Sequence, residues 1–192
     1  MGLDMYFFKK TYVKNWDHAP ERKHEVSVKL NGEKHPAIDP KKVTYIQEEV
    51  GYWRKANSIH QWFVDNCQNG NDECQEAYVD VEKMKELLNL CQAIKENCKL
   101  KKGKISHGYT IGADGEEIHN MQDGMIMENP LFAADLLPTQ SGFFFGGTEY
   151  DEYYMQDIDN TIKIMKDELA LIEKHAKDET PLMTEYYYRS SW

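Results

Sequence analysis

Hydrophobic and polar side chains alternate along the stretch that ends at Arg54, and the spacing becomes helical shortly afterwards. In an extended chain successive side chains point to opposite sides, so one face of this stretch carries Ile46, Val50 and Tyr52. A few residues later the apolar positions recur every three or four residues, as on the buried side of a helix. The pattern predicts a strand that runs directly into a helix. It places Arg54 on the apolar face of the strand and His60 near the middle of the apolar stripe of the helix.

The same two periodicities predict elements along the rest of the chain. Strands or extended segments are expected at 3–13, 25–30, 43–54, 77–79 and 182–192. Helices are expected at 56–67, 81–97 and 149–174, with a short helix at 130–136. Asn31 and Gly32 are typical of a tight hairpin turn. Asp80 is typical of a helix cap, and Thr148 with Asp151 of a capping box.

These elements together predict an α+β fold, with a mainly antiparallel sheet packed against about three helices. Residues 105–111 and 117–121 are expected to form the arms of a hairpin, and 139–147 a loop with a short strand. A chain of 192 residues is expected to form a single domain, 1–192. The irregular segment 99–128, which begins with a basic run that indicates an exposed boundary, is a candidate insertion within it.

The chain has no apolar run long enough to cross a membrane and no secretory signal pattern, so a cytoplasmic location is expected. Four cysteines occur without a C-x-x-C motif, and apolar neighbours favour buried, reduced thiols. A bond between Cys67 and Cys74 is left open. The sequence leaves the oligomeric state unknown.

Charge divides the chain into two unequal parts. Residues 1–111 hold 18 basic and 16 acidic side chains, a balance of +2, whereas 112–192 hold 5 and 17, a balance of −12. The acidic part argues against nonspecific binding of nucleic acid or of an anionic membrane on that side. It is compatible with a basic partner protein.

The segment QSGFFFGGT, which precedes the third long helix, is the first candidate site. Gly146 and Gly147 permit a ligand to approach the backbone closely, and Ser141 and Thr148 supply hydroxyl groups. A glycine-rich turn that enters a helix offers backbone N–H groups to an anion. The segment lacks the lysine of a phosphate-binding P-loop, and a capped helix with a flexible lead-in explains the same residues.

Tyrosines form the second candidate site. They are clustered in two stretches of sequence: Tyr150, Tyr153 and Tyr154 in one, and Tyr186, Tyr187 and Tyr188, with Trp192, in the other. Tyrosine combines apolar contact area with a polar end, which suits ligand stacking or a protein interface. Packing of the last strand beside the start of the third helix remains the alternative.

Catalytic and metal-binding motifs are absent from the sequence. The seven histidines lack the spacing of a zinc-binding helix, and no G-x-S-x-G motif occurs. We therefore expect no metal, no cofactor and no catalytic residue. His60 is the one candidate for an acid or base. The competing interpretation is structural: His60 and Arg54 would be partly buried, with backbone carbonyls and a carboxylate such as Glu48 or Glu49 as their partners.

Several blocks of the sequence resemble a family of small proteins encoded by bacteriophages, prophages and some bacteria. These blocks are MGLDMY at residues 1–6, EVGYWRKANSIHQWFVDN at 49–66, LLPTQSGFFFGGTEYDEYY at 136–154, and the final YYYRSSW. The resemblance covers about a third of the positions and brings no activity with it. It implies a cytosolic phage accessory protein that counters host defence or alters host metabolism.

The leading functional hypothesis is a non-enzymatic protein that binds a small anionic, nucleotide-like ligand. Arg54 would meet the anion, the glycine-rich segment would supply donors, and Trp53 or a tyrosine would stack on the base. The candidate ligand-binding residues are Trp53, Arg54, His60, Ser141, Gly146, Gly147, Thr148, Tyr150 and Tyr154. One alternative is an acidic, tyrosine-rich protein that blocks a basic host protein surface; a weaker one is an enzyme that uses His60.

Overall fold

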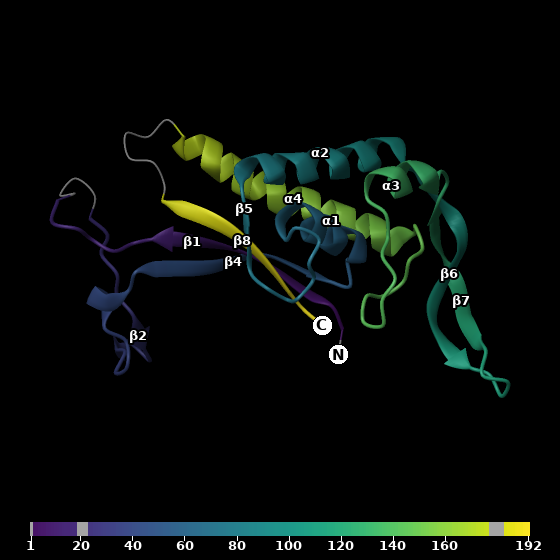
Figure 1. The fold of residues 1–192 in the computed structure, drawn as a ribbon, viewed down its shortest axis with the longest axis horizontal. Coiled ribbons are helices and arrows are strands. Elements are labelled where there is room, and N and C mark those ends of the chain that lie inside the picture. Colours follow the sequence, from purple (N-terminus) through teal and green to yellow (C-terminus); the bar gives the residue numbers. More distant parts are fainter. Residues whose placement is uncertain (1, 19–22, 177–182) are drawn as a thin grey trace.

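A four-stranded antiparallel sheet forms the body of the protein. The computed structural model describes residues 2–18, 23–176 and 183–192, and confirms the α+β class. The strands are β4 (Tyr45–Arg54), β1 (Asp4–Tyr12), β8 (Thr184–Ser191) and β5 (Ala77–Val79), in this spatial order. The predicted final strand began at residue 182, which lies outside the described residues. Of the two central strands, β1 lies near the start of the sequence and β8 near its end (Figure 1).

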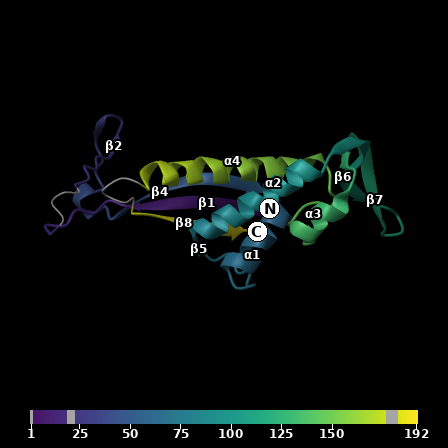
Figure 2. The ribbon, with the colours of Figure 1, turned by 90° about the horizontal axis from the view of Figure 1, so that it is seen from above.

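Helices cover one face of this sheet. Four α-helices occur in the described residues, the three long ones and the short one that were predicted: α1 (Asn57–Cys67), α2 (Val81–Asn97), α3 (Pro130–Leu136) and α4 (Glu152–His175), with the 3₁₀ turn η1 (Pro40–Lys42). Helices α2 and α4 run side by side over the strands (Figures 1 and 2). No helix in the described part of the chain is long and apolar enough to cross a membrane.

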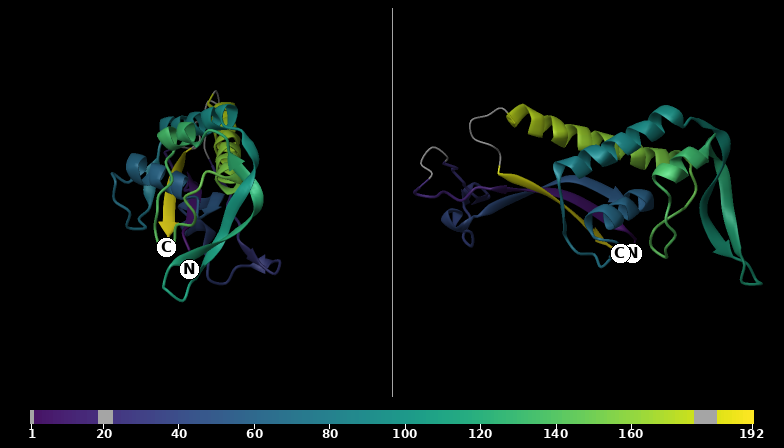
Figure 3. Two further views of the ribbon diagram at one scale, coloured as in Figure 1. Left: turned by 90° about the vertical axis from the view of Figure 1, so that its right-hand side faces the viewer. Right: turned by 45° about the horizontal axis from the view of Figure 1, so that its top comes forward.

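Alternation along each strand separates a buried face from an open face. The side chains that face the helices include Met5, Phe7, Trp53, Tyr186 and Tyr188, all nearly inaccessible to solvent. Phe63 of α1 stacks on Tyr188 with ring centroids 4.0 Å apart, and so ties α1 to the sheet. Their neighbours Tyr52, Arg54, Tyr78 and Arg189 point away from the helices and are exposed. Figure 3 shows the helices gathered on one side of the sheet.

A β-bulge at Val50 sets which residues of β4 are buried. Phe7 pairs with Gly51, whereas Phe8 pairs with Glu49, so Val50 has no partner of its own in β1. An extra residue reverses the alternation on the two sides of a bulge. Gly51 and Trp53 therefore face the helices. The prediction that Arg54 lies on the buried face was wrong, since its side chain is 59% exposed.

Gly51 lets α4 approach the sheet closely. A Cβ atom at this position would lie 2.9 Å from the Ile164 side chain and 3.3 Å from Phe7. A side chain here would force the helix or the strand to move. The absence of a side chain at Gly51 is therefore part of the packing between α4 and β4.

A long hairpin projects from the end of the body near α3, opposite the end where β2 lies (Figure 1). It consists of β6 (Leu100–Ile111) and β7 (Glu117–Met127), which are both longer than predicted. The basic run that was expected to be an exposed boundary lies inside β6. The hairpin is attached at its base, where Met127 N–H donates to the Tyr150 carbonyl at 2.9 Å. The candidate insertion 99–128 thus coincides with a regular β-arm.

Turns and caps follow the sequence closely in most places. Asn31 and Gly32, between β2 (Lys29–Leu30) and β3 (Glu33–Lys34), have φ angles of 51° and 87°, as a tight hairpin turn requires. The second predicted strand, 25–30, is reduced to the two residues of β2. The side chain of Asp80 accepts from Lys83 N–H and caps α2, as predicted.

The start of α4 differs from the prediction. Asp151 is the N-cap residue, and its carboxylate accepts the N–H groups of Tyr153 and Tyr154. Thr148 lies three residues earlier, and its carbonyl accepts the hydroxyl of Thr139 at 3.0 Å. The helix therefore begins at residue 152 rather than at 149. The short strand expected within 139–147 is absent, and this described segment contains turns instead.

Replacing Gly51 by valine tests its packing role. We expect Gly51→Val to lower the free energy of unfolding by about 1–3 kcal/mol, because the new side chain would overlap Ile164. Urea denaturation measures the change. Gln47→Val introduces the same side chain on the exposed face of the same strand and should change stability by less than about 0.5 kcal/mol. Equal effects of the two substitutions would contradict this account.

Asp157 in α4 makes stability depend on pH. Burial, and then the negative charge of Asp151, raise the pKa of Asp157 from 3.8 to about 7. The folded state then holds this proton more tightly than the unfolded state, so stability falls as pH rises from about 4 to about 7. Asp157→Asn should stabilise the protein by about 1–3 kcal/mol at about pH 8 and leave it nearly unchanged at about pH 4. Denaturation of this variant across pH, with the exposed Asp167→Asn in the same helix as control, checks the expectation. A pH-independent difference would refute it.

Candidate ligand-binding site

The junction between β4 and α1 brings together two segments that the sequence analysis singled out. Lys55 adopts a left-handed conformation, with φ of 62°, and its N–H donates to the Leu3 carbonyl at 2.8 Å. Gly146, with φ of +90°, packs directly against this residue: a Cβ atom there would lie 3.0 Å from Cβ of Lys55. The glycine-rich segment therefore lies beside Lys55, the residue after Arg54, although Gly146 and Arg54 are 92 positions apart in the sequence.

Asn57 fixes the glycine-rich segment in this position. Its side-chain amide donates to the carbonyls of Phe145 and Gly147 at 3.1 and 2.8 Å, and its oxygen accepts the N–H of Gln140 at 2.9 Å. The residue is 4% exposed. The sequence analysis missed Asn57. A polar amide on the first turn of an otherwise apolar helix face was the available signal, because buried amides require partners.

Arg54 points from the end of β4 onto the open face of the sheet. In the register of β4, β1 and β8, Tyr52 lies opposite Tyr6, and Tyr6 lies opposite Arg189. The rings of Tyr6 and Tyr52 are 5.5 Å apart. The only carboxylate paired with Arg54 in the described residues is that of Asp4, at 3.8 Å. This carboxylate also accepts the Tyr52 hydroxyl, which raises the pKa of Tyr52.

Trp53 lies on the opposite face and takes no part in this arrangement. It is 2% exposed, and its indole N–H donates to the Thr161 hydroxyl at 2.9 Å. The reversal of alternation at Val50 explains the difference from the expected geometry. Tyr52, which is 42% exposed, is the aromatic residue that accompanies Arg54.

Tyr150 and Tyr154 lie away from Arg54, near the start of α4. The Tyr154 hydroxyl donates to the Leu137 carbonyl at 2.9 Å, and that of Tyr150 accepts the Thr139 N–H at 3.1 Å. Tyr154 is buried, which raises its pKa. The two rings lie 4.9 Å apart and connect α4 to the segment after α3.

Ser141, Gly147 and Thr148 are exposed. A Cβ atom on Gly147 would lie 2.6 Å from a carboxylate oxygen of Glu149, so a negative charge already lies beside this glycine. An anion would be repelled there. The structure brings Gly146 close to Arg54 but places the hydroxyl groups of Ser141 and Thr148 in a less favourable setting for an anion than the sequence implied.

His60 is fully buried and hydrogen-bonded at both ring nitrogens. Nε2 lies 2.9 Å from the Asp72 carboxylate, and Nδ1 lies 2.7 Å from the Tyr188 hydroxyl. Because a carboxylate can only accept, Nε2–H donates to Asp72, and Nδ1 and the Tyr188 hydroxyl share the second hydrogen bond. The expected carboxylate partner, Glu48 or Glu49, was wrong. Asp72 comes from the loop after α1, and its other oxygen accepts the indole N–H of Trp192 at 3.2 Å.

The two tyrosine groups do not form one surface. Tyr186 and Tyr188 are buried beneath the helices, whereas Tyr187 lies on the open face beside Tyr78, with ring centroids 5.9 Å apart. Tyr153 is exposed at the start of α4. The expectation of a common packing or recognition cluster is therefore replaced by three separate locations.

Metal ligands and thiols add no further site. Within the described ranges, no group of three or more His, Cys, Asp and Glu side chains could hold a metal ion. Cys67, Cys74, Cys91 and Cys98 are free thiols. Burial raises the pKa of Cys67 and of Cys91 to about 12, so neither is activated as a nucleophile.

Removing the Tyr188 hydroxyl tests the structural role of His60. Tyr188→Phe should lower the free energy of unfolding by about 1–3 kcal/mol, because a ring nitrogen of a buried histidine loses its hydrogen-bond partner. Tyr187→Phe removes a hydroxyl that donates to the exposed Glu185 and should cost less than about 0.5 kcal/mol. Urea denaturation of both variants measures the difference. A cost for Tyr188→Phe no larger than that of Tyr187→Phe would show that the hydrogen bond contributes little.

Comparisons with known proteins found no relative of this chain. No family model, no curated protein and no solved structure matches this chain. The function is therefore inferred from the geometry of the open face and of the β4–α1 junction.

Proposed function

We propose that the protein is a non-enzymatic accessory protein that binds a small anionic, nucleotide-like ligand at the end of the open sheet face. Two exposed arginines adjoin the Tyr6–Tyr52 pair in the strand register: Arg189 lies opposite Tyr6 in β8, and Arg54 lies two residues beyond Tyr52 in β4. This observation carries the proposal. The two arginine Cα atoms are separated by two strand spacings and two residues, about 12 Å.

Guanidinium groups and aromatic rings supply complementary parts of nucleotide recognition. An arginine binds phosphate oxygens through two parallel N–H groups, and a tyrosine ring stacks on a base. Both arginines are on long side chains that can converge above the Tyr6–Tyr52 pair. Lys55 follows Arg54 in the chain and adds a positive charge at the same end of the sheet. The glycine-rich segment packs against Lys55 but contributes less to anion binding, because the Glu149 carboxylate lies beside Gly147.

The distribution of charge supports this location. The acidic part of the sequence supplies α4, whose carboxylates lie on the helical side of the sheet, whereas β1 and β4 come from the balanced part. Asp4 is the carboxylate nearest to Arg54, and it is shared with the Tyr52 hydroxyl. A phosphate that displaced this weak pairing would gain a stronger partner in Arg54.

The cellular setting follows from the resemblance to phage-encoded proteins. We propose that the protein acts in the cytoplasm of an infected bacterium, where capture of a nucleotide-like molecule would counter a host defence. An acidic interaction protein has less support, because the tyrosines do not gather on the acidic side. Acid–base catalysis by His60 has less support because the ring is fully buried with both nitrogens engaged.

Binding of adenosine monophosphate tests the proposal. We expect measurable binding by calorimetry or nuclear magnetic resonance, with weaker binding of adenosine and of inorganic phosphate, because each lacks one part of the recognised structure. Arg54→Gln and Tyr52→Ala should each reduce the affinity about tenfold. Tyr45→Ala, at the far end of the same strand and face, and Lys29→Gln should leave the affinity unchanged.

Two results would count against the proposal. One is the absence of binding by the nucleotide; the other is equal affinity of the protein and its Arg54→Gln variant. His60→Gln supplies a further check, because it should lower stability without a direct effect on the ligand contacts.

A further inference from the structure

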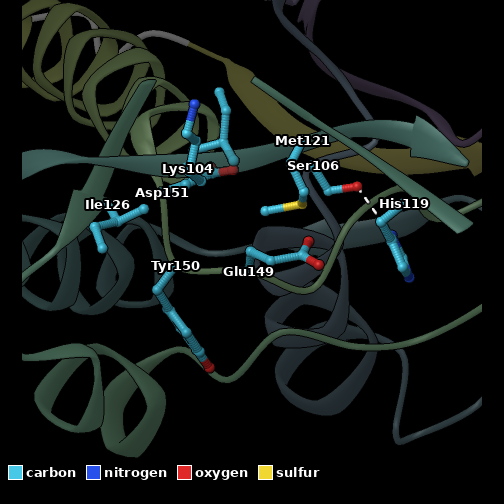
Figure 4. Close-up of a pocket in the computed structure, with 9 residues that line it drawn as sticks. Lys104, Ser106, His119, Met121, Ile126, Glu149, Tyr150 and Asp151 are labelled. Atoms are coloured by element: carbon cyan, nitrogen blue, oxygen red, sulfur yellow. Dashed lines mark hydrogen bonds between the residues drawn. The ribbon is translucent and has the colours of Figure 1, made fainter. Parts of the chain in front are cut away.

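A cavity lies between the β6–β7 hairpin and the segment just before α4. Its volume is about 280 Å³, comparable to that of roughly nine water molecules in the liquid. The lining residues come from β6, β7 and the segment just before α4: Lys104, Ile105, Ser106, His119, Met121, Ile126, Glu149, Tyr150 and Asp151. Figure 4 shows these side chains around the space.

Two glycines explain why the space is not filled. Gly103 and Gly124 face each other across the hairpin. A Cβ atom on Gly103 would lie 2.6 Å from Ile126, and one on Gly124 would lie 2.5 Å from Ile105. The two isoleucine side chains therefore lie against the bare backbone of the opposite strand. They form an apolar wall of the cavity instead of occupying its centre.

The hairpin is fixed at the base of this cavity by backbone hydrogen bonds. Met127 N–H donates to the Tyr150 carbonyl, and Ile126 forms a β-bridge with Asp151. The Tyr150 hydroxyl is in turn bonded to Thr139. The cavity thus has a rigid floor, and its walls belong to regular strands.

The charged groups at the cavity are mainly acidic. Asp151 is 6% exposed, and Glu149 directs its carboxylate into the space near Met121 and His119 (Figure 4). Lys104, the one basic side chain of the lining, pairs with Asp123 at 2.7 Å. Burial raises the pKa of Asp151, and the charge of Glu149 raises it further. Ser106 and His119 are hydrogen-bonded to each other at 3.0 Å.

We propose that this cavity binds a small molecule that carries one ammonium group on an apolar body. The ammonium would contact the Glu149 carboxylate and lie close to Asp151, since a buried carboxylate gains from a nearby positive charge. The apolar body would lie against Ile105, Ile126 and Met121. Glu149 lies beside Gly147 of the glycine-rich segment, so the two regions adjoin. The tests use different residues, Met121 and Glu149 here and Arg54 and Tyr52 for the nucleotide-like ligand, so either proposal can fail alone.

The methyl group of Met121 provides the readout. In the full chain with isotope-labelled methionine methyl groups, n-pentylamine should shift the Met121 resonance in a saturable manner, whereas the buried Met84 and Met165 should not respond. The neutral analogue n-pentanol should bind about tenfold more weakly, because it cannot form the charged contact. Glu149→Gln should also reduce the affinity for the amine about tenfold.

Glu116→Gln, at the exposed tip of the hairpin, removes a carboxylate outside the cavity and should leave the amine affinity unchanged. A Met121 resonance that does not respond to the amine would overturn the site. Equal affinities for amine and alcohol, or an equal effect of the two glutamate substitutions, would overturn the assignment of the ammonium contact to Glu149.

Discussion

Val50 in β4 has no partner in β1, and this extra residue reverses the side of the sheet on which the following side chains lie. Trp53 therefore packs against the helices. The faces on which Gly51, Trp53 and Arg54 lie depend on this bulge. On one side, Trp53 contacts Thr161 of α4, and Gly51 leaves room for Ile164. On the other side, Arg54 remains in water, where its charge needs no buried partner. Without the extra residue, the helices would pack against Arg54, and an arginine in a core without compensation is strongly unfavourable.

Polar side chains on the first two turns of α1 then organise the surroundings of the junction. Asn57 holds the glycine-rich segment through three hydrogen bonds, and His60 connects the helix to β8 and to the loop that carries Asp72. Phe145 links the two systems, because its carbonyl is bound by Asn57 and its ring meets the edge of the His60 ring. A change at either residue is therefore transmitted to the same loop.

The sequence allowed prediction of the features that depend on neighbouring residues. The turn at Asn31, the cap at Asp80 and the apolar stripe of α1 each follow from local chemistry. The bulge at Val50 could not be predicted, because it is defined by pairing with Phe7 and Phe8 in a distant strand. Tyr188, which bonds His60 from β8, was missed for the same reason, and Asp72 was missed because it lies in an irregular loop twelve residues further along the chain. The length of the β6–β7 hairpin was underestimated because it projects from the body, so burial does not impose a clear alternation on it.

The pairing of β1 with β8 has a consequence for how the molecule reaches its native state. Thr11 and Thr184, whose hydroxyls lie 3.0 Å apart, are separated by 173 positions. Because these are the two central strands, β4 and β5 cannot belong to one sheet until β8 is inserted between β1 and β5. Contacts of such high sequence separation slow folding and leave strand edges exposed meanwhile. On a ribosome, the helices and the hairpin would be synthesised before β8, so the four-stranded sheet would be completed last.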